Sequence, residues 1–174
     1  MLKLLRPDLY LGSLFDITPK MLEDLGIKAL ILDLDNTLVV RGEEKAEPEV
    51  SEWLKALQER GIKLCIVSNN SRGKGGKIAR ALGLQGVFRA IKPWGKPFRK
   101  ALRLLGEKAS STAMVGDQLF TDVLGGNRMG LYTIMVTSLG GPDFILTRLI
   151  IRKLERIVLS RLGYKSNLFR GVRG

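Results

Sequence analysis

The sequence predicts a three-layer α/β fold in which a central parallel sheet of about five strands is flanked by helices. Three observations support this prediction. Apolar runs such as 28–34 and 63–67 show no polar alternation, which is typical of strands buried on both faces. Segments with helical periodicity separate these runs, and such alternation favours a parallel sheet. The length of 174 residues is enough for one domain with a sizeable core.

The first half of the chain contains a lead-in, a central strand and a long helix. The lead-in covers residues 1–28, with a short helix over about 19–25 because Thr18 suits an N-cap and proline follows it. After the strand at 28–34, Pro48 begins a helix that ends at Gly61. Its apolar stripe, which we assign to the core, consists of Val50, Trp53, Leu54 and Leu57.

The second half repeats the alternation. We expect strands over 63–67, 85–91, 111–115 and 131–136, separated by helices over about 73–82, 97–106 and 119–129. We assign 1–138 to one core domain with its lead-in. We expect residues 139–174 to form a basic C-terminal helix, over about 143–162, and a tail, packed on the core or at a membrane surface.

Composition indicates a soluble globular protein, with 45% hydrophobic and 26% charged residues. The absence of histidine excludes histidine-based zinc sites and histidine general bases. The single cysteine, Cys65, lies in an apolar run, so we expect a buried thiol and a reducing compartment. The opening residues are too short and interrupted for a signal peptide, and no apolar run approaches the ~18 residues of a spanning helix. We therefore expect a cytoplasmic protein, or one peripheral to the inner face of the membrane.

Polar side chains follow the carboxyl end of each central strand, and in a parallel sheet these ends converge on one edge. The residues are Asp33, Asp35, Ser68, Asn69, Lys92, Lys96, Asp117 and Asp122. Several carboxylates without histidine or cysteine suit a hard, oxygen-ligated cation such as Mg²⁺. The alternative for Asp33 and Asp35 is a pair of solvated loop acids after a core strand.

This set resembles the four motifs of the haloacid dehalogenase-like (HAD) phosphohydrolases. The motifs are Asp33-Leu34-Asp35-Asn36-Thr37, Val67-Ser68-Asn69, Lys96-Pro97 and the stretch from Gly116-Asp117 to Asp122. Finer features resemble the YqeG-type branch of HAD subclass IIIA, whose members include phosphatidylglycerophosphatases. These features are Ser68-Asn69-Asn70, the double Lys92-Pro93 and Lys96-Pro97, and the extension of the fourth motif to Asn127-Arg128.

The resemblance implies roles for these residues. Asp33 would be the nucleophile and Asp35 the general acid and base. Lys96 would offset negative charge, and Mg²⁺ would be held by Asp33, the Asp35 carbonyl and Asp117, with Asp122 in support. The substrate-binding residues would be Ser68, Asn69, Asn70, Lys92 and Thr37.

Structural alternatives remain for three of these residues. Ser68 could be a helix N-cap, and Asp122 could support a helix N-terminus. Lys96 could be a solvated turn lysine, with Lys92 as its rival for the site.

Neither the gap after the first motif nor the gap between the second and third motifs has room for a large cap domain. The fold implied is therefore a capless HAD-like Rossmannoid. Its site would be open, and a bulky substrate or an oligomer would have to exclude water. A phosphate on a macromolecule or a lipid headgroup meets that need.

Positive charge is concentrated in two blocks of the chain, whose net formal charge is +12. Residues 72–108 contain eleven basic side chains and one acidic, and residues 144–174 contain eight and one. Such blocks attract phosphorylated substrates, nucleic acid or anionic membranes. Arginines recur every four residues on one face of the C-terminal helix, which suits a membrane interface or a helix that covers the core.

Three functions fit these features. We favour a Mg²⁺-dependent phosphatase that acts on phosphatidylglycerophosphate. The second is the same chemistry on a nucleotide, a sugar phosphate or a polynucleotide end. The third is a non-catalytic protein that binds RNA or ribosomes.

Overall fold

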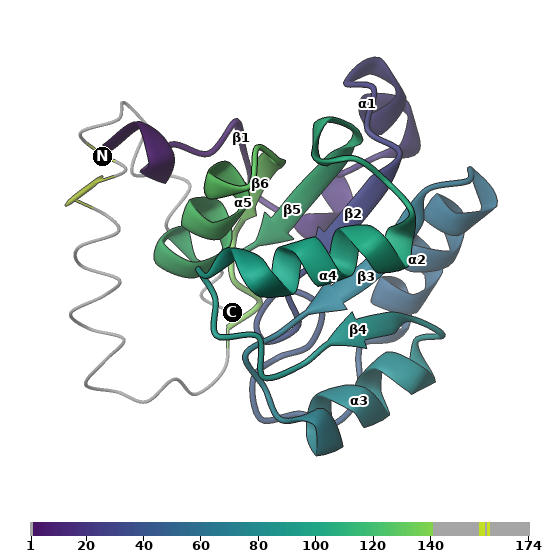
Figure 1. Cartoon of the computed structure of the whole chain (residues 1–174). Coiled ribbons are helices and arrows are strands. Elements are labelled where there is room, and N and C mark those ends of the chain that lie inside the picture. Colours follow the sequence, from purple (N-terminus) through teal and green to yellow (C-terminus); the bar gives the residue numbers. More distant parts are fainter. Residues whose placement is uncertain (1, 141–156, 159, 161–174) are drawn as a thin grey trace.

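A computed structural model of the chain describes residues 2–140, 157, 158 and 160. Six parallel strands form one sheet in the order β1-β6-β5-β2-β3-β4 (Figure 1). The strands are β1 (Leu9–Leu11), β2 (Ala29–Leu32), β3 (Lys63–Val67), β4 (Gln85–Val87), β5 (Thr112–Gly116) and β6 (Tyr132–Val136). The predicted α/β class and parallel sheet are thus confirmed, with one strand more than the five expected.

The helices are α1 (Pro19–Asp24), α2 (Pro48–Glu59), α3 (Arg72–Ala81), α4 (Gly95–Leu105) and α5 (Leu124–Arg128). A π-helical turn, Leu119–Val123, leads into α5 within the helix predicted over 119–129. Short 3₁₀ turns lie at Leu2–Leu5, Leu14–Asp16 and Ala109–Ser111. The predicted C-terminal helix lies outside the described residues, apart from 157, 158 and 160.

The additional strand, β1, comes from the predicted lead-in and pairs with β6 at the edge of the sheet. The Asp8 carboxylate fastens this edge, because it accepts hydrogen bonds from the backbone N–H of Thr133 at 2.7 Å and from its hydroxyl at 2.9 Å. Three residues are too few to show a period, so only the pairing with β6 reveals the strand.

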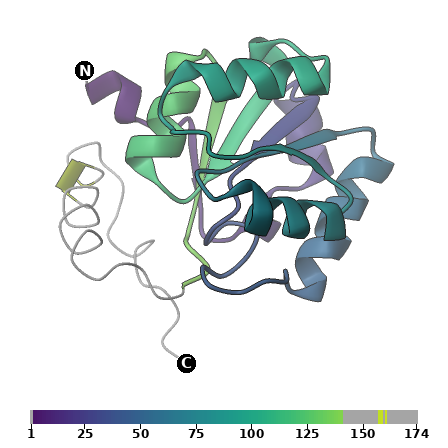
Figure 2. The ribbon, with the colours of Figure 1, turned by 60° about the horizontal axis from the view of Figure 1, so that its bottom comes forward.

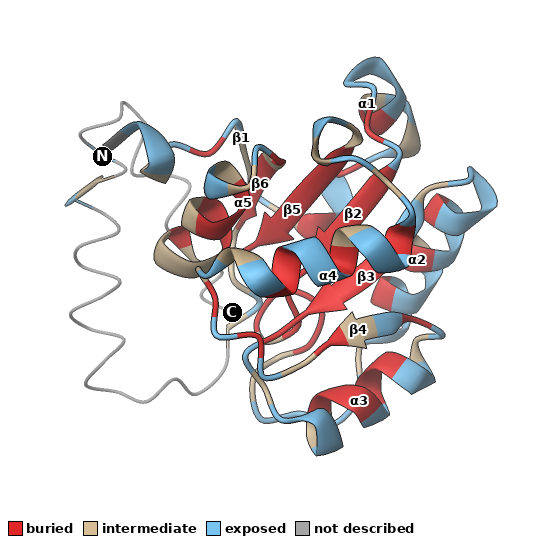
Figure 3. Ribbon diagram, in the orientation of Figure 1, coloured by how far each residue is buried: buried red, intermediate tan, exposed pale blue. Residues whose placement is uncertain are grey.

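Alternate residues of the central strand β2 pack on opposite faces of the sheet. Leu30 and Leu32 belong to the core beneath α1, α2 and α3, whereas Ala29 and Ile31 pack with Phe98 of α4. Figure 2 shows α4 on the opposite side of the sheet from α2. In Figure 3 the inner strands β2, β3, β5 and β6 are largely buried, the edge strands β1 and β4 are partly exposed, and the outer helix faces are exposed. These layers explain the unbroken apolar run of β2, since both faces are covered.

The chain after β4 leaves the extended conformation, which shortens the strand predicted over 85–91. Arg89 and Ile91 have φ angles of 51° and 53°. These values lie in the left-handed region, where a strand cannot continue. The helix expected to open at Pro97 begins two residues earlier, at Gly95, after the extended Trp94.

The described chain contains no separate cap domain, as predicted. Residues 33–47 connect β2 directly to α2, and residues 68–111 contain only α3, β4, α4 and a 3₁₀ turn. None of the helices described is long and apolar enough to cross a bilayer.

Close packing between α4 and α5 depends on Gly125. A Cβ built there would lie 2.5 Å from Cζ of Phe98, which is fully buried and cannot move aside. We expect Gly125→Ala to lower the free energy of unfolding by about 1–3 kcal/mol, measured by urea denaturation. Gly73→Ala is the matched control, since its Cβ would meet only Ser71 Oγ at 3.9 Å. Equal stability of the two variants would contradict this packing.

Candidate active site

The strand order brings distant acidic residues together. The chain places β3 and β4 on one side of β2 and then returns to place β5 on the other. Asp33 follows β2 directly, and Asp117 follows β5. Ligands of open α/β sheets bind where the direction of strand order reverses, which here is the carboxyl edge of β2 and β5.

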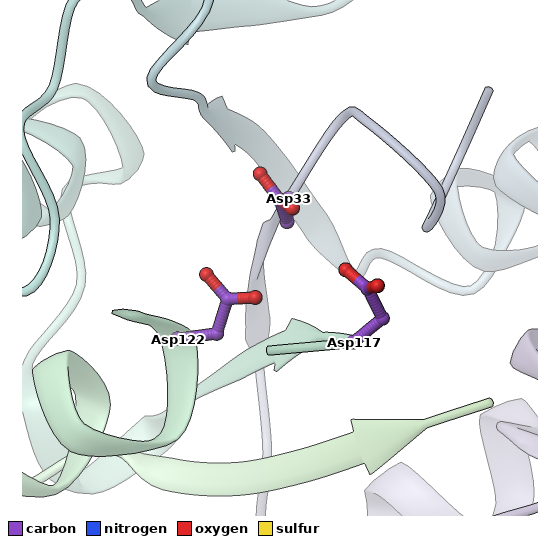
Figure 4. Close-up of side chains that lie close together, drawn as sticks. All are labelled: Asp33, Asp117 and Asp122. Atoms are coloured by element: carbon purple, nitrogen blue, oxygen red, sulfur yellow. The ribbon is translucent and has the colours of Figure 1, made fainter. Parts of the chain in front are cut away.

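Three buried carboxylates meet at this edge. Asp33, Asp117 and Asp122 each offer an oxygen, and the three oxygens lie within 4.8 Å of one another. Figure 4 shows the side chains pointing toward one another from three separate segments. All three residues are buried, with 0% to 3% of their surface exposed. Such a set of hard oxygen donors fits a divalent cation such as Mg²⁺.

Gly116 makes room for one member of the cluster. A Cβ at this position would overlap the Asp122 carboxylate. The backbone N–H of Gln118 donates to Asp122 Oδ2 at 3.1 Å, and the Thr121 hydroxyl donates to Oδ1 at 3.3 Å. Asp122 lies within the π-helical turn and is therefore held by that turn, together with the N–H of Gln118, which precedes it.

A buried lysine joins two of the carboxylates. Lys92 Nζ lies 2.6 Å from Asp33 Oδ1 and 2.7 Å from Asp122 Oδ1, and its side chain is 2% exposed. The two carboxylates raise the pKa of Lys92 against the opposing effect of burial, so its ammonium stays charged. The position beside Asp33 that the resemblance assigned to Lys96 is therefore occupied by Lys92. Lys96 is exposed in the first turn of α4.

Burial and mutual repulsion both act against ionisation of the clustered carboxylates. Burial raises the pKa of Asp122, and repulsion from Asp33 and Asp117 adds to this effect, while Lys92 opposes it. Lys92 contacts Asp33 and Asp122, and carboxylates taken out of water need positive charge nearby to stay ionised. A divalent cation held by Asp33, Asp117 and Asp122 meets this requirement.

Asp35 lies beside the cluster, and its side chain is half-buried. Burial raises its pKa, and the neighbouring Asp33 carboxylate adds to the rise, while Arg41 and Lys74 oppose it. Asn70 Nδ2 donates to Asp35 Oδ1 at 3.3 Å. A carboxyl group with a raised pKa retains its proton to higher pH and suits a general acid.

The turn after β2 links the first and fourth motifs. Asn36 has a φ of 62°, and its Oδ1 accepts a hydrogen bond from the backbone N–H of Arg41 at 3.0 Å. The next residue, Thr37, donates its hydroxyl to Asp117 Oδ1 at 3.4 Å. This turn places Thr37 among the carboxylates.

The segment after β3 holds the loop that carries Lys92. Asn69 Oδ1 accepts a hydrogen bond from the backbone N–H of Lys92 at 2.8 Å. Ser68 is buried, and its Oγ accepts one from the backbone N–H of Asn70 at 3.0 Å. Ser68 is not the N-cap of α3, because Ser71 has that role and accepts from the N–H of Lys74.

The structure thus brings most of the expected residues to one edge of the sheet. Hydrogen bonds, ion pairs and the carboxylate cluster link Asp33, Asp35, Thr37, Ser68, Asn69, Asn70, Lys92, Asp117 and Asp122. Gly116 and Thr121 belong to the fourth motif, but the sequence assigned neither a role, and only the contacts with Asp122 reveal one. A cavity of about 620 Å³ lies elsewhere, at the amino edge near Lys28 and Arg60. It contains none of the clustered residues.

Comparison with known proteins agrees with this geometry. The "haloacid dehalogenase-like hydrolase" family model matches residues 39–130. The chain is 40% identical over 166 residues to the "probable phosphatase YqeG" of Bacillus subtilis, a match that covers 95% of this chain and 96% of that protein. It is 27% identical over 154 residues to the chloroplastic phosphatidylglycerophosphate phosphatase 1 of Chlamydomonas reinhardtii, covering 82% of this chain and 56% of that protein.

Solved structures agree on the fold. The cobalt-bound deoxy-D-mannose-octulosonate 8-phosphate phosphatase of Haemophilus influenzae superposes with a TM-score of 0.54 at 17% identity. The match covers 84% of this chain and 95% of that one. Since the family model, the YqeG match and the carboxylate edge agree, the chain belongs to the haloacid dehalogenase-like hydrolases, as a phosphatase of the YqeG type.

Proposed function

We propose that the protein is a Mg²⁺-dependent phosphomonoester hydrolase that works through an aspartyl phosphate on Asp33. The observation that carries this proposal is the meeting of Asp33, Asp117 and Asp122, two of which contact Lys92, with Asp35 beside them. We further propose that its substrate is phosphatidylglycerophosphate, which it converts to phosphatidylglycerol.

In the first half-reaction, a carboxylate oxygen of Asp33 attacks the phosphorus. The bond from phosphorus to the ester oxygen breaks, and the leaving alkoxide takes the proton of the Asp35 carboxyl. The raised pKa of Asp35 favours the protonated form that this step needs. The products are the free alcohol and a phosphoryl group on Asp33.

In the second half-reaction, water attacks the phosphorus of the aspartyl phosphate. The Asp35 carboxylate takes a proton from this water, and the acyl phosphate bond breaks. Inorganic phosphate leaves, Asp33 returns to its carboxylate form, and Asp35 is protonated for the next cycle.

The surrounding groups stabilise negative charge during both steps. Lys92 touches Asp33 and is suited to neutralise the phosphoryl oxygens as they approach. Bound Mg²⁺, held by Asp33, the backbone carbonyl of Asp35 and Asp117 with Asp122 in direct contact or in support, would supply further positive charge to the phosphoryl oxygens. Thr37, Ser68, Asn69 and Asn70 supply hydroxyl and amide donors around the same position.

Two observations support a lipid substrate. The chain is similar along 82% of its length to a protein named for phosphatidylglycerophosphate. The described chain also lacks a cap domain, so a substrate anchored in a surface can reach the carboxyl edge of the sheet. We therefore infer that the enzyme works peripherally at the inner face of the membrane.

Turnover by the purified protein tests the roles of the nucleophile and the metal. Purified protein with Mg²⁺ should release phosphate from phosphatidylglycerophosphate in mixed micelles, and chelation of the metal should stop release. Asp33→Asn should lower turnover by at least about 10⁴-fold, as expected when a covalent nucleophile is lost. The exposed Asp24→Asn is the matched control and should retain wild-type turnover.

A panel of phosphate esters tests the substrate assignment. Faster turnover of a nucleotide, a sugar phosphate or a polynucleotide end would reject the lipid and keep the chemistry. If no ester is hydrolysed and RNA binds equally well to wild type and Asp33→Asn, the enzyme assignment fails.

Two substrates with different leaving groups test whether Asp35 is the general acid. A p-nitrophenolate leaving group needs no proton, whereas an alkoxide does. Asp35→Asn should therefore lower phosphate release from a glycerol phosphate ester by about 10²–10⁴-fold. Formation of the phosphoryl enzyme from p-nitrophenyl phosphate, measured as a nitrophenol burst, should fall much less. Equal losses in the two measurements would argue against proton donation by Asp35.

Substitution of each lysine by methionine compares the catalytic roles of Lys92 and Lys96. Lys92→Met removes the ammonium beside Asp33 and should lower kcat by about 10²–10³-fold. Lys96→Met removes an exposed charge and should leave turnover of p-nitrophenyl phosphate within about threefold of wild type. The opposite order of the two effects would restore the role of Lys96 that the sequence motif implies.

A further inference from the structure

Two large apolar side chains are exposed next to the active-site lysine. Ile91 is 68% exposed and Trp94 is 65% exposed, more than the other large hydrophobic residues exposed in the described chain. Between them lies Lys92, whose ammonium is buried against Asp33. The same short segment thus has one side in the site and the other side in solvent.

A tight turn sets this arrangement. The backbone N–H of Trp94 donates to the carbonyl of Ile91 at 3.2 Å, so the two residues stand at the ends of one four-residue turn. The loop leading into it is fastened to the carboxyl edge of the sheet. Ala90 N–H donates to the Ser68 carbonyl at 3.1 Å, and Lys92 N–H donates to Asn69 Oδ1 at 2.8 Å. The apolar pair is therefore a fixed part of the rim of the site.

The stability of the fold does not explain why position 91 is an isoleucine. Its φ of 53° is costly for a β-branched residue and would suit asparagine or glycine better. Its side chain recovers little of this cost, because most of its surface is in water. A partner that buries the side chain would supply the missing stabilisation.

The positively charged residues around the turn indicate an anionic partner. No Asp or Glu occurs between Glu59 and Glu107. Arg89 precedes the turn, and Arg99 and Lys100 lie in the second turn of α4, all three exposed. An exposed tryptophan and an aliphatic side chain among basic residues have the composition of an interfacial anchor on an anionic bilayer. A nucleic acid fits less well, since an isoleucine side chain cannot stack on a base.

We propose that the Arg89–Lys100 segment docks the protein on an anionic lipid bilayer, with Ile91 and Trp94 inserted at the headgroup level. This docking would hold the carboxyl edge of the sheet against the surface. This inference rests on the proposed function in one respect: docking would explain how the proposed active site reaches the phosphate of a lipid.

Vesicle binding tests the proposal without turnover. We would sediment the full chain with vesicles of phosphatidylcholine containing about a quarter phosphatidylserine, which is anionic but is not the proposed product, and with vesicles of phosphatidylcholine alone. Neither lipid is a phosphomonoester, so binding does not depend on substrate recognition. The protein should bind the anionic vesicles, and raised salt should weaken binding.

Substitutions in the turn should weaken this binding. Ile91→Asn combined with Trp94→Gln should lower the partition coefficient about tenfold or more. Asparagine suits the backbone of residue 91, so the variant should remain folded, as urea denaturation can check. Leu25→Gln, at the end of α1, is the matched control, since it removes an exposed leucine at the amino edge and should leave binding within about twofold.

Fluorescence supplies a second measurement, specific to Trp94. The other tryptophan, Trp53, is half-buried and donates its indole N–H to the Ile17 carbonyl at 2.9 Å. Brominated lipids in the anionic vesicles should quench the exposed Trp94, and the quenched part of the emission should disappear in Trp94→Gln. Vesicle binding without this quenching would overturn the proposal.

The remaining outcomes separate docking from catalysis. Vesicle binding without hydrolysis of any lipid phosphate would keep the docking surface and reject the substrate. Hydrolysis of lipid phosphate in detergent micelles by a protein that binds no anionic vesicle would reject the docking surface alone. Binding of single-stranded RNA that the turn variants lose, with no binding to vesicles, would replace the bilayer with a nucleic acid.

Discussion

The meeting of three buried carboxylates, two of them paired with the Lys92 ammonium, is the constraint on which this structure depends. Asp33 and Asp122 both approach Lys92, and Asp117 lies within 4.8 Å of the acidic pair. Like charges taken out of water repel strongly unless they are neutralised. A fold keeps such a group only where a cation or a proton joins it, and this requirement links the electrostatics of the site to phosphoryl chemistry.

Local structure around the cluster follows from this constraint. Gly116 has no side chain where the Asp122 carboxylate must lie. The left-handed turn at Asn36 brings Thr37 to Asp117, so the strand end and the neighbouring loop share one network. The loop after β4 leaves the sheet early and carries Lys92 inward, which turns Ile91 and Trp94 outward. The same backbone path thus positions a charge in the site and an apolar pair on its rim.

Sequence reasoning succeeded where a signal was local and failed where it was not. The strand β2 and the helix over 48–59 were predictable from neighbouring residues. An unbroken apolar run indicates a strand buried on both faces, and apolar residues at helical spacing indicate a helix. β1 was missed because three residues show no period. The sequence left Lys92 and Lys96 as rivals for the place beside Asp33, because both precede a proline and only the path of the loop shows which ammonium turns inward.

The sequence alone determined the fold class, the order of the motifs and the chemical nature of the site, because each depends on residue types at short spacing. Only the tertiary structure decided which lysine meets Asp33, that Asp122 joins the carboxylate cluster, and that the side chains of Ile91 and Trp94 lie in solvent. These results depend on strand order and on backbone conformation at a few positions, which bring together residues from Asp33 to Asp122 that are far apart in the chain.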